Sequence, residues 1–178
     1  MKRLVLLLML FATACGSADA TGQELAGPAG TAGPAASASA GPSASATPDA
    51  RAAVLAGYGA YWTALLHAHA AGDPADPQLD AHATGTARTD AAAGIRADTA
   101  RGIRMKGAVK HKPVVSAVSA TAATVTDCVD LRSWLAYDVP SGRRDPSIRP
   151  IGRVTGTYTL TSFGGSWLVS AAKQGDFC

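Results

Sequence analysis

The spacing of apolar residues divides the chain into a helical part and a strand-forming part. Between residues 50 and 71 the large aromatic and aliphatic side chains fall on one face of a helix, and small residues cover the opposite face. Thr47-Pro48-Asp49 provides a start for this helix, and Gly72-Asp73-Pro74 provides its end. Two shorter helices are predicted over residues 77–83 and 86–101.

From residue 103 onward apolar and polar residues alternate, which predicts strands. The predicted strands cover residues 103–113, 114–120, 123–131, 134–139, 153–163 and 166–172. Gly164-Gly165 predicts a tight hairpin between the last two strands, and Trp167, Val169 and Ala171 are expected on one face of the final strand. This order favours an α+β fold, in which a long N-terminal amphipathic helix and two shorter helices pack on a curved, mainly antiparallel sheet of four to six strands.

The N-terminal residues predict export. Met1-Lys2-Arg3 is a basic segment, and the apolar run from Leu4 to Ala14 is too short to span a bilayer, where about 20 residues are needed. We therefore expect residues 1–14 to be a signal peptide. Ala12-Thr13-Ala14-Cys15 resembles the lipobox of bacterial lipoproteins, with Ala12 where that family usually has Leu, and this implies that Cys15 carries acyl chains such as palmitate. The same residues also fit ordinary signal-peptide cleavage, which gives a secreted protein instead.

The segment after the signal peptide predicts a tether. Residues 15–48 are rich in Gly, Ala, Ser and Pro, and Leu25 is their only large aliphatic residue. Such a composition buries too little apolar surface to offset the entropy cost of ordering the chain. We therefore expect a disordered tether that joins a lipid-anchored Cys15 to a single domain over residues 49–178.

Alanine accounts for much of the hydrophobic composition. The sequence holds 39 Ala but only 32 Leu, Ile, Val and Phe, and eight of these 32 precede residue 49. The expected domain therefore has a thin core for its length. A disulfide between Cys128 and Cys178, the two cysteines left when Cys15 is acylated, would compensate in an oxidising compartment. Two free thiols are the alternative.

Charge and composition exclude several classes of function. The formal net charge of +3 gives no indication of nucleic-acid binding, and no nucleotide-binding loop, metal-ligand cluster or nucleophile elbow occurs. We expect no nucleic-acid partner, no cofactor and no metal. The sequence has no Asn, and Glu24 is its only glutamate, so any carboxylate chemistry in the domain must use Asp. This excludes a Cys-His-Asn triad and a Glu-dependent zinc hydrolase.

Three side chains are candidates for catalysis. Asp127 alternates with Val125 and Val129, which places its carboxylate on the buried face of a strand; pairing with a nearby Arg or backbone N–H is the alternative. Tyr58 and His69 lie on the apolar face of the first helix, about 16 Å apart along its axis. They cannot touch, but both can border one cavity. A buried structural histidine near the helix end is the alternative for His69.

A row of cations follows the first predicted strand. Arg104, Lys106, Lys110 and Lys112 project from one face of the strand expected over residues 103–113. Such a row suits an anionic lipid or polymer. A solvated strand edge that lysine protects from pairing is the alternative.

The order of the elements resembles the nuclear-transport-factor-two-like superfamily. The Tyr58-x-x-Tyr61-Trp62 segment and the terminal Gly-Gly-Ser-Trp-Leu-Val hairpin (164–169) carry this resemblance. More narrowly, the segment 125–130, Trp134 and the closing Cys178 resemble small exported lipoproteins of actinobacteria. The resemblance implies a cystatin- or ketosteroid-isomerase-like cone with a cavity between sheet and first helix. The ligand-contacting residues that it implies are Tyr58, Trp62, Trp134 and Trp167.

Two functions follow from these observations. The first is a non-enzymatic accessory module of the cell envelope, anchored by lipid at the outer face of the cytoplasmic membrane, that binds an envelope protein or a small apolar ligand. The alternative is an isomerase- or cyclase-type enzyme acting on a small apolar ligand, in which Asp127 acts with Tyr58 or His69. A cavity that reaches Asp127 favours the enzyme, and a cavity filled by the tryptophans favours the interaction module.

Overall fold

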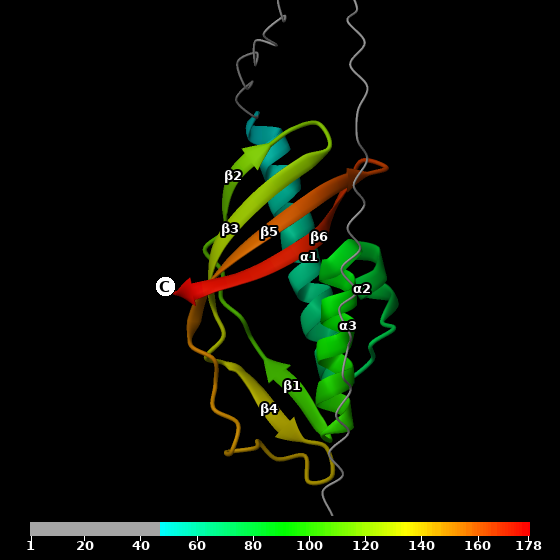
Figure 1. The fold of residues 1–178 in the computed structure, drawn as a ribbon, viewed down its shortest axis with the longest axis vertical. Helices are drawn as coiled ribbons and strands as arrows, with labels where there is room; N and C mark the ends of the chain where they lie inside the picture. The colour runs from blue at the N-terminus through cyan, green and yellow to red at the C-terminus, as the bar shows by residue number, and fades with distance from the viewer. Residues whose placement is uncertain (1–46) are drawn as a thin grey trace, which may run out of the picture. The chain divides into compact units, whose positions relative to one another are not determined.

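The computed structural model describes residues 47–178. The predicted signal peptide, Cys15 and nearly all of the predicted tether lie outside the described residues. Within the described part, three helices are followed by six strands, and the helices pack against the strands (Figure 1), so the predicted α+β class is confirmed. No helix of residues 47–178 is long and apolar enough to cross a membrane.

The first helix, α1, extends over Pro48–Ala71 and is fixed at both ends by its sequence. Thr47 caps its start, because the Thr47 hydroxyl accepts a hydrogen bond from the backbone N–H of Ala50 at 3.2 Å. Gly72 ends it in the left-handed conformation, with φ of 69°, which glycine adopts without strain. The long helix predicted over residues 50–71 is therefore confirmed, with a slightly earlier start.

Two shorter helices follow, α2 over Pro77–His82 and α3 over Gly85–Ala100, close to their predicted bounds. Asp76 caps α2 by accepting hydrogen bonds from the backbone N–H groups of Gln78 and Leu79. The other carboxylate oxygen of Asp76 lies 2.6 Å from His67 Nδ1 of α1. A single buried carboxylate thus both starts α2 and joins it to α1.

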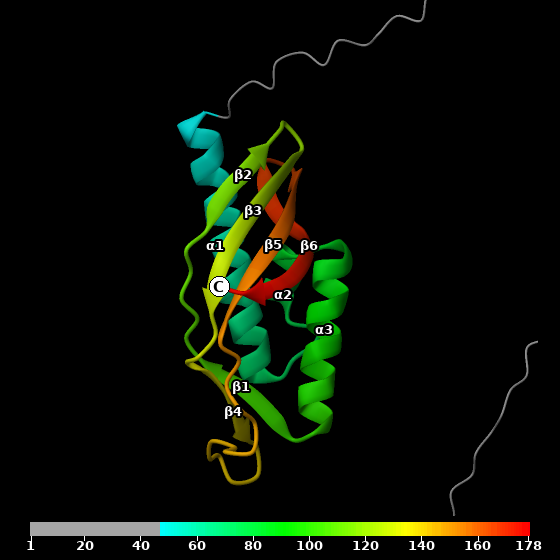
Figure 2. The same ribbon diagram turned by 60° about the vertical axis from the view of Figure 1, so that its left-hand side comes forward.

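The strands form two separate antiparallel ladders. Four of them make a sheet in the order β2–β3–β5–β6, and β1 pairs with β4 alone. The strands are β1 (Ile103–Gly107), β2 (Val114–Val118), β3 (Ala122–Asp130), β4 (Trp134–Asp138), β5 (Arg153–Phe163) and β6 (Ser166–Phe177). Figure 2 shows the β1–β4 ladder beyond the end of the larger sheet, at which β3 ends and β5 begins.

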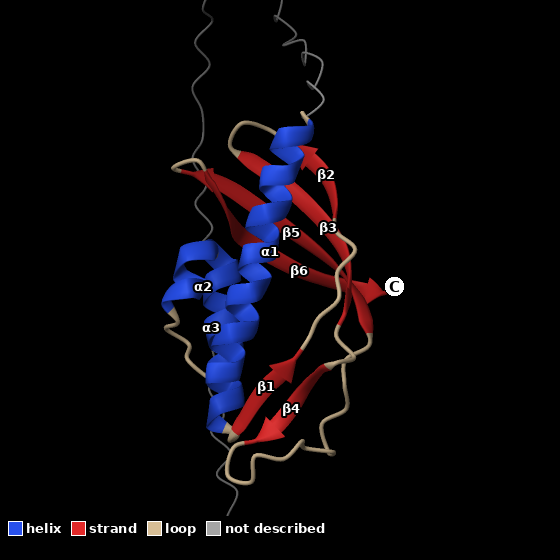
Figure 3. Cartoon of the chain, turned by 180° about the vertical axis from the view of Figure 1, so that it is seen from behind, coloured by secondary structure: helices blue, strands red, loops and turns tan. Residues whose placement is uncertain are grey.

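The core lies between α1 and the four-stranded sheet. Figure 3 shows α1 crossing one face of this sheet, and α2 and α3 also pack against β6. The largest fully buried side chains come from all of these layers: Val54, Tyr58, Leu79, Ile95, Val125, Asp127, Val129, Leu160 and Val169. Each large aliphatic among them contributes about 1.5–3 kcal/mol by leaving water. Asp127 is the only charged residue in this set.

A bulge in β6 changes which side chains face the core. Val169 pairs with Leu160, but Ala171 pairs with Thr159, so β6 carries one extra residue at this point. Ala171 therefore takes the outer face with Thr159, and Ala172, an exposed residue, pairs with Tyr158 and borders a cavity on the other face. The prediction that Ala171 shares a face with Val169 is wrong, because the bulge interrupts the period of two.

β1 ends at Gly107, so the strand predicted over residues 103–113 is too long. Gly107 has a φ of 121°, and a Cβ atom at this position would collide with the carbonyl oxygen of Ser133. Only glycine tolerates this conformation and this close approach. Residues 108–113 then form a loop, which backbone hydrogen bonds between Lys110 and Asp130 hold to the end of β3.

The predicted row of four cations on one strand face is also wrong, because the strand does not continue past Gly107. Arg104 instead donates a hydrogen bond to the carbonyl oxygen of Ala71, at the C-terminal end of α1. Lys106 lies over the ring of Tyr137 in β4, with 5.7 Å from its Nζ atom to the ring centroid. Of the four cations, only Lys110 and Lys112 belong to the loop over residues 108–113.

Cys128 of β3 and Cys178, which follows β6, are joined in a disulfide with their Cα atoms 6.0 Å apart. This supports the predicted pairing. Because β5 lies between β3 and β6 in the sheet, the bond bridges across β5. It closes a loop with a sequence separation of 50 residues, and such a cross-link stabilises a fold by about 4 kcal/mol through the lost entropy of the unfolded chain.

Replacing Cys178→Ser should lower the free energy of unfolding by about 4 kcal/mol, because the unfolded chain regains the freedom of the open loop. Denaturation in guanidinium chloride without reducing agent measures the change. Cys15→Ser is the matched control and should leave the midpoint in place, since it spares the Cys128–Cys178 bond. Equal midpoints for Cys178→Ser and the parent protein would contradict the stabilising role of the bond.

Candidate functional site

Asp127 lies at the centre of a polar triad with Tyr58 and His111. Its carboxylate is on the inner face of β3, and the residue is 1% exposed. The Tyr58 hydroxyl donates to Asp127 Oδ2 at 2.6 Å, and His111 Nδ1 lies 2.7 Å from the same oxygen. The backbone N–H of Lys112 donates to Oδ1 at 2.5 Å. Since a carboxylate only accepts, the His111 Nδ1–H is a donor, and three donors engage the two oxygens.

Each member of the triad comes from a different element. Tyr58 projects from the inner face of α1, Asp127 belongs to β3, and His111 belongs to the loop over residues 108–113. Asp127 faces Gly156 across the β3–β5 pairing, and a Cβ atom at Gly156 would collide with the ring of Tyr158. The glycine thereby leaves room for the Tyr158 ring, which packs edge-to-face on Tyr58 with centroids 4.9 Å apart.

Burial keeps the tyrosine hydroxyls protonated. The pKa of Tyr58 is raised far above its usual range, chiefly because burial disfavours the phenolate and also because Tyr158 and Asp127 lie nearby. Burial likewise raises the pKa of Tyr158 and takes that of Tyr61 to about 12. Tyr58 is therefore a hydrogen-bond donor in this site at any physiological pH and cannot act as a base.

A cavity of about 240 Å³ lies beside the triad, and we call it the aromatic cavity. Most of its wall is apolar, and four aromatic rings contribute to it: Tyr61, Trp62, Trp134 and Tyr158. Neither Asp127 nor Tyr58 lines it. The Trp62 ring packs on His111 with centroids 4.8 Å apart, and Tyr158 packs on Tyr58, so two rings of the cavity wall contact members of the triad.

The structure does not bring His69 to the triad. His69 is 8% exposed, lies near the C-terminal end of α1, and packs edge-to-face on Trp134 with centroids 4.9 Å apart. Its Nδ1 atom lies 3.3 Å from Asp98 Oδ2 of α3, but the angle is not that of a hydrogen bond. Burial lowers the pKa of His69, and the nearby Asp98 only partly opposes this effect. His69 is therefore a buried, neutral side chain at neutral pH.

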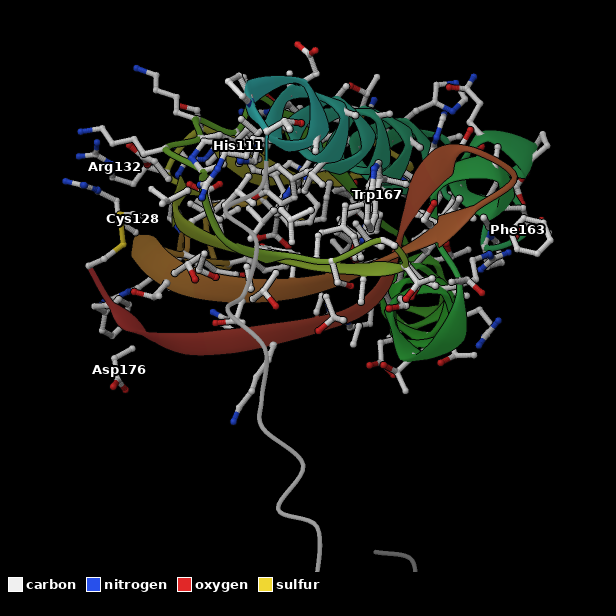
Figure 4. The ribbon with its side chains drawn as sticks, turned by 90° about the horizontal axis from the view of Figure 1, so that it is seen from above. His111, Cys128, Arg132, Phe163, Trp167 and Asp176 are labelled. Atoms are coloured by element: carbon white, nitrogen blue, oxygen red, sulfur yellow. A yellow bond between two sulfur atoms is a disulfide. The ribbon has the colours of Figure 1, made fainter. Side chains whose placement is uncertain are left out.

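The four predicted ligand contacts separate into three groups. Trp62 and Trp134 line the aromatic cavity, and Tyr58 lies behind its wall. Trp167 borders a different, shallow hollow against the first half of α1. Figure 4 shows Trp167 on the side of the β5–β6 turn, away from Cys128.

His111 was not among the predicted site residues. The alternating pattern assigned it to a continuous strand, whereas it belongs to a loop that folds back onto Asp127. Two signals for that loop are present in the sequence, since Gly107 favours a break and Pro113 has no N–H for a strand ladder. Neither signal indicates that the imidazole turns inward.

Among residues 47–178, no group of three or more His, Cys, Asp or Glu side chains is arranged to hold a metal ion.

No protein-family model and no curated protein matches this chain. Solved structures that are similar to it in part include two at 14–15% identity. The first is a candidate dehydratase of the NTF2-like family from Streptomyces avermitilis, at 15% identity and a TM-score of 0.46, covering 70% of this chain and 97% of that one.

The second is the intermembrane-space region of the chloroplast protein ARC6, at 14% identity and a TM-score of 0.43. It covers 70% of this chain and 96% of that one. Neither likeness identifies a family or an activity for this chain. A proposal about what this chain binds or does therefore rests on its own side chains.

Tyr58→Phe should lower the free energy of unfolding by about 1.5–3 kcal/mol, because it removes one of the donors to a buried carboxylate. Tyr61→Phe is the matched control, since it removes a hydroxyl from the same face of α1 without touching Asp127. Urea denaturation at pH 7 compares the two variants. An effect of Tyr58→Phe no larger than that of Tyr61→Phe would show that the Asp127 hydrogen bond contributes little to stability.

His69 should make the protein less stable in mild acid. Its pKa lies below 6.5 in the folded protein, so the stability that comes from the neutral imidazole is complete above about pH 6.5. It is lost as the pH falls through the lowered pKa, because the unfolded chain binds the proton first. His69→Phe keeps the ring against Trp134 and should flatten this part of the pH profile, measured by urea denaturation between pH 7.5 and 5. His82→Phe should keep the slope of the parent protein, and parallel profiles for all three would refute the assignment.

Proposed function

We propose that the protein is a non-catalytic binding domain of NTF2-like type, exported to the cell envelope, that holds a small apolar ligand in the aromatic cavity. The observation that carries this proposal is the contrast between the two parts of the site. The cavity is open and mostly apolar, whereas the buried carboxylate of Asp127 does not line it, and both of its oxygens already accept hydrogen bonds. A binding role needs the apolar cavity and does not need a reactive Asp127 carboxylate.

The hydrogen bonds to the Asp127 carboxylate argue against the isomerase- or cyclase-type alternative. A general base must reach the proton that it removes, within hydrogen-bonding distance or through one water. Three donors already engage Asp127, and its side chain does not line the aromatic cavity. Tyr58 remains protonated, and His69 lies in a separate cluster with Trp134. Asp127, Tyr58 and His69 therefore do not line one cavity in which a substrate could contact two of them.

The size of the cavity limits the part of a ligand that it can hold. Drug-sized ligands occupy pockets of about 300–1,000 Å³, and an apolar cavity of about 150 Å³ accepts benzene. A cavity of about 240 Å³ lies between these limits. Its aromatic walls favour a ligand with two or three fused or linked rings, or an aliphatic chain of similar volume, which packs on the rings by dispersion and by loss of water.

The proposed location rests on residues at the start of the chain and on the disulfide. Residues 1–14 would direct export, and an acylated Cys15 would hold the mature chain at the outer face of the cytoplasmic membrane, with secretion as the alternative. The Cys128–Cys178 bond supports an oxidising compartment outside the cytoplasm, because such bonds are rare in reducing ones. In this arrangement the membrane is a partner through the lipid.

Titration with N-phenyl-1-naphthylamine, a neutral probe that fluoresces in apolar surroundings, tests the proposed binding. We expect a saturable rise in fluorescence that Ala172→Phe abolishes, because the new ring fills the cavity that Ala172 lines. Ala171→Phe adds the same ring to the outer face of β6 and should leave binding unchanged. Absence of saturable binding to the parent protein, or equal loss in both variants, would overturn the proposal.

A further inference from the structure

A second hollow, of about 370 Å³, lies next to the disulfide, and its charge is strongly one-sided. Four cationic side chains line it, Lys110, Lys112, Arg132 and Arg153, against the single carboxylate of Asp130. We call it the basic hollow. Figure 4 shows His111, Arg132 and Cys128, which all border it, gathered on one side of the fold.

The backbone around the basic hollow is held in place. Backbone hydrogen bonds in both directions join Lys110 to Asp130, and the N–H of Lys112 donates to the buried Asp127 carboxylate. The Arg153 side chain lies against the disulfide, with Nη2 3.3 Å from Cys128 Sγ. Cations from the loop over residues 108–113, from the residues after β3 and from β5 therefore border one space.

Most of this positive charge has no partner. Arg132 is paired with Asp130 at 2.6 Å, and this pairing, with a smaller effect of the nearby Arg153, holds the pKa of Asp130 well below its usual range. Within residues 47–178, no ion pair forms at Lys110, Lys112 or Arg153. The excess of three positive charges at the hollow equals the formal net charge of the entire chain. Unpaired like charges around one hollow repel, and a bound anion relieves that repulsion.

We propose that the basic hollow binds a phosphate group, either on a free phosphate compound or on a lipid headgroup. A phosphate monoester carries about −1.5 to −2 charges at pH 7 and offers three strong acceptor oxygens. It can therefore meet donors from several directions at once, whereas a carboxylate has one charge and two oxygens. Arg153 supplies the planar fork that suits a phosphate, and the two lysines supply point charges.

This site is independent of the proposed ligand in the aromatic cavity. The contact between Trp62 and His111 separates the two, because Trp62 lines the aromatic cavity and His111 lines the basic hollow. A failure of naphthylamine binding therefore leaves the phosphate proposal standing, and the reverse also holds.

The test uses the mature chain from residue 15 onward, with Cys15→Ser so that no acyl chain can bind a membrane. Inorganic phosphate is titrated against sodium chloride of equal ionic strength, and nitrogen-15 NMR follows the amide signals of residues 110–112, 132 and 153. We expect saturable shifts at these residues. Lys112→Gln combined with Arg153→Gln should weaken binding about a hundredfold, since each lost charge-assisted hydrogen bond is worth roughly a factor of ten.

Arg143→Gln combined with Arg144→Gln is the matched control, because it removes the same charge from the loop between β4 and β5, outside the basic hollow. It should change the phosphate affinity by less than about twofold, since exposed charges at a distance are screened by salt. Thermal melting confirms that both double variants are folded. Equal weakening in the two double variants would overturn the proposal, and so would shifts that do not saturate when phosphatidic acid vesicles are not bound either.

Sedimentation with vesicles separates the two sources of phosphate. Vesicles that contain phosphatidic acid expose a phosphate monoester, and vesicles of phosphatidylcholine alone do not. Binding to the first vesicles only, lost with Lys112→Gln and Arg153→Gln, supports the hollow as a headgroup site. Binding of inorganic phosphate without sedimentation supports it as a site for a free phosphate compound. Absence of both would overturn the proposal.

Discussion

The buried carboxylate of Asp127 joins the helix layer, the sheet and the loop over residues 108–113. Removing a carboxylate from water costs several kcal/mol, so such a group is tolerated only where donors replace its hydration. Tyr58, His111 and the N–H of Lys112 are those donors. The loop therefore cannot move away from β3 without exposing or orphaning a buried charge, which makes its conformation part of the core.

The two hollows depend on this arrangement. His111 turns inward to Asp127, and its ring becomes the surface on which Trp62 packs. On one side of that contact the space is aromatic and mostly apolar, and on the other side it is polar and cationic. The triad thus acts as a partition between two environments. The geometry of the triad therefore matters for both hollows, whether or not a proton moves through it.

The parts of the fold that follow from local chemistry could be predicted from the sequence. Thr47 and Gly72 define α1, Gly164-Gly165 defines the last hairpin, and alternation with valines placed Asp127 inside. The bulge in β6 and the inward turn of the loop after Gly107 could not be predicted in the same way, because both depend on contacts between segments that are distant in sequence. The contact of His111 with Asp127 could not be predicted for the same reason. A periodic pattern says which face a residue occupies only while the strand continues.

The disulfide across β5 also affects the chain after the fold is lost. Residues 128–178 remain a closed ring, so a stretched chain cannot use their contour length, which is about 170 Å at 3.3–3.6 Å per residue. A force applied through the N-terminal side would extend the segment before Cys128 and leave β4, β5 and β6 inside the ring. The unfolded protein is therefore more compact than its length implies, and the strands of the last hairpin remain close enough to pair again.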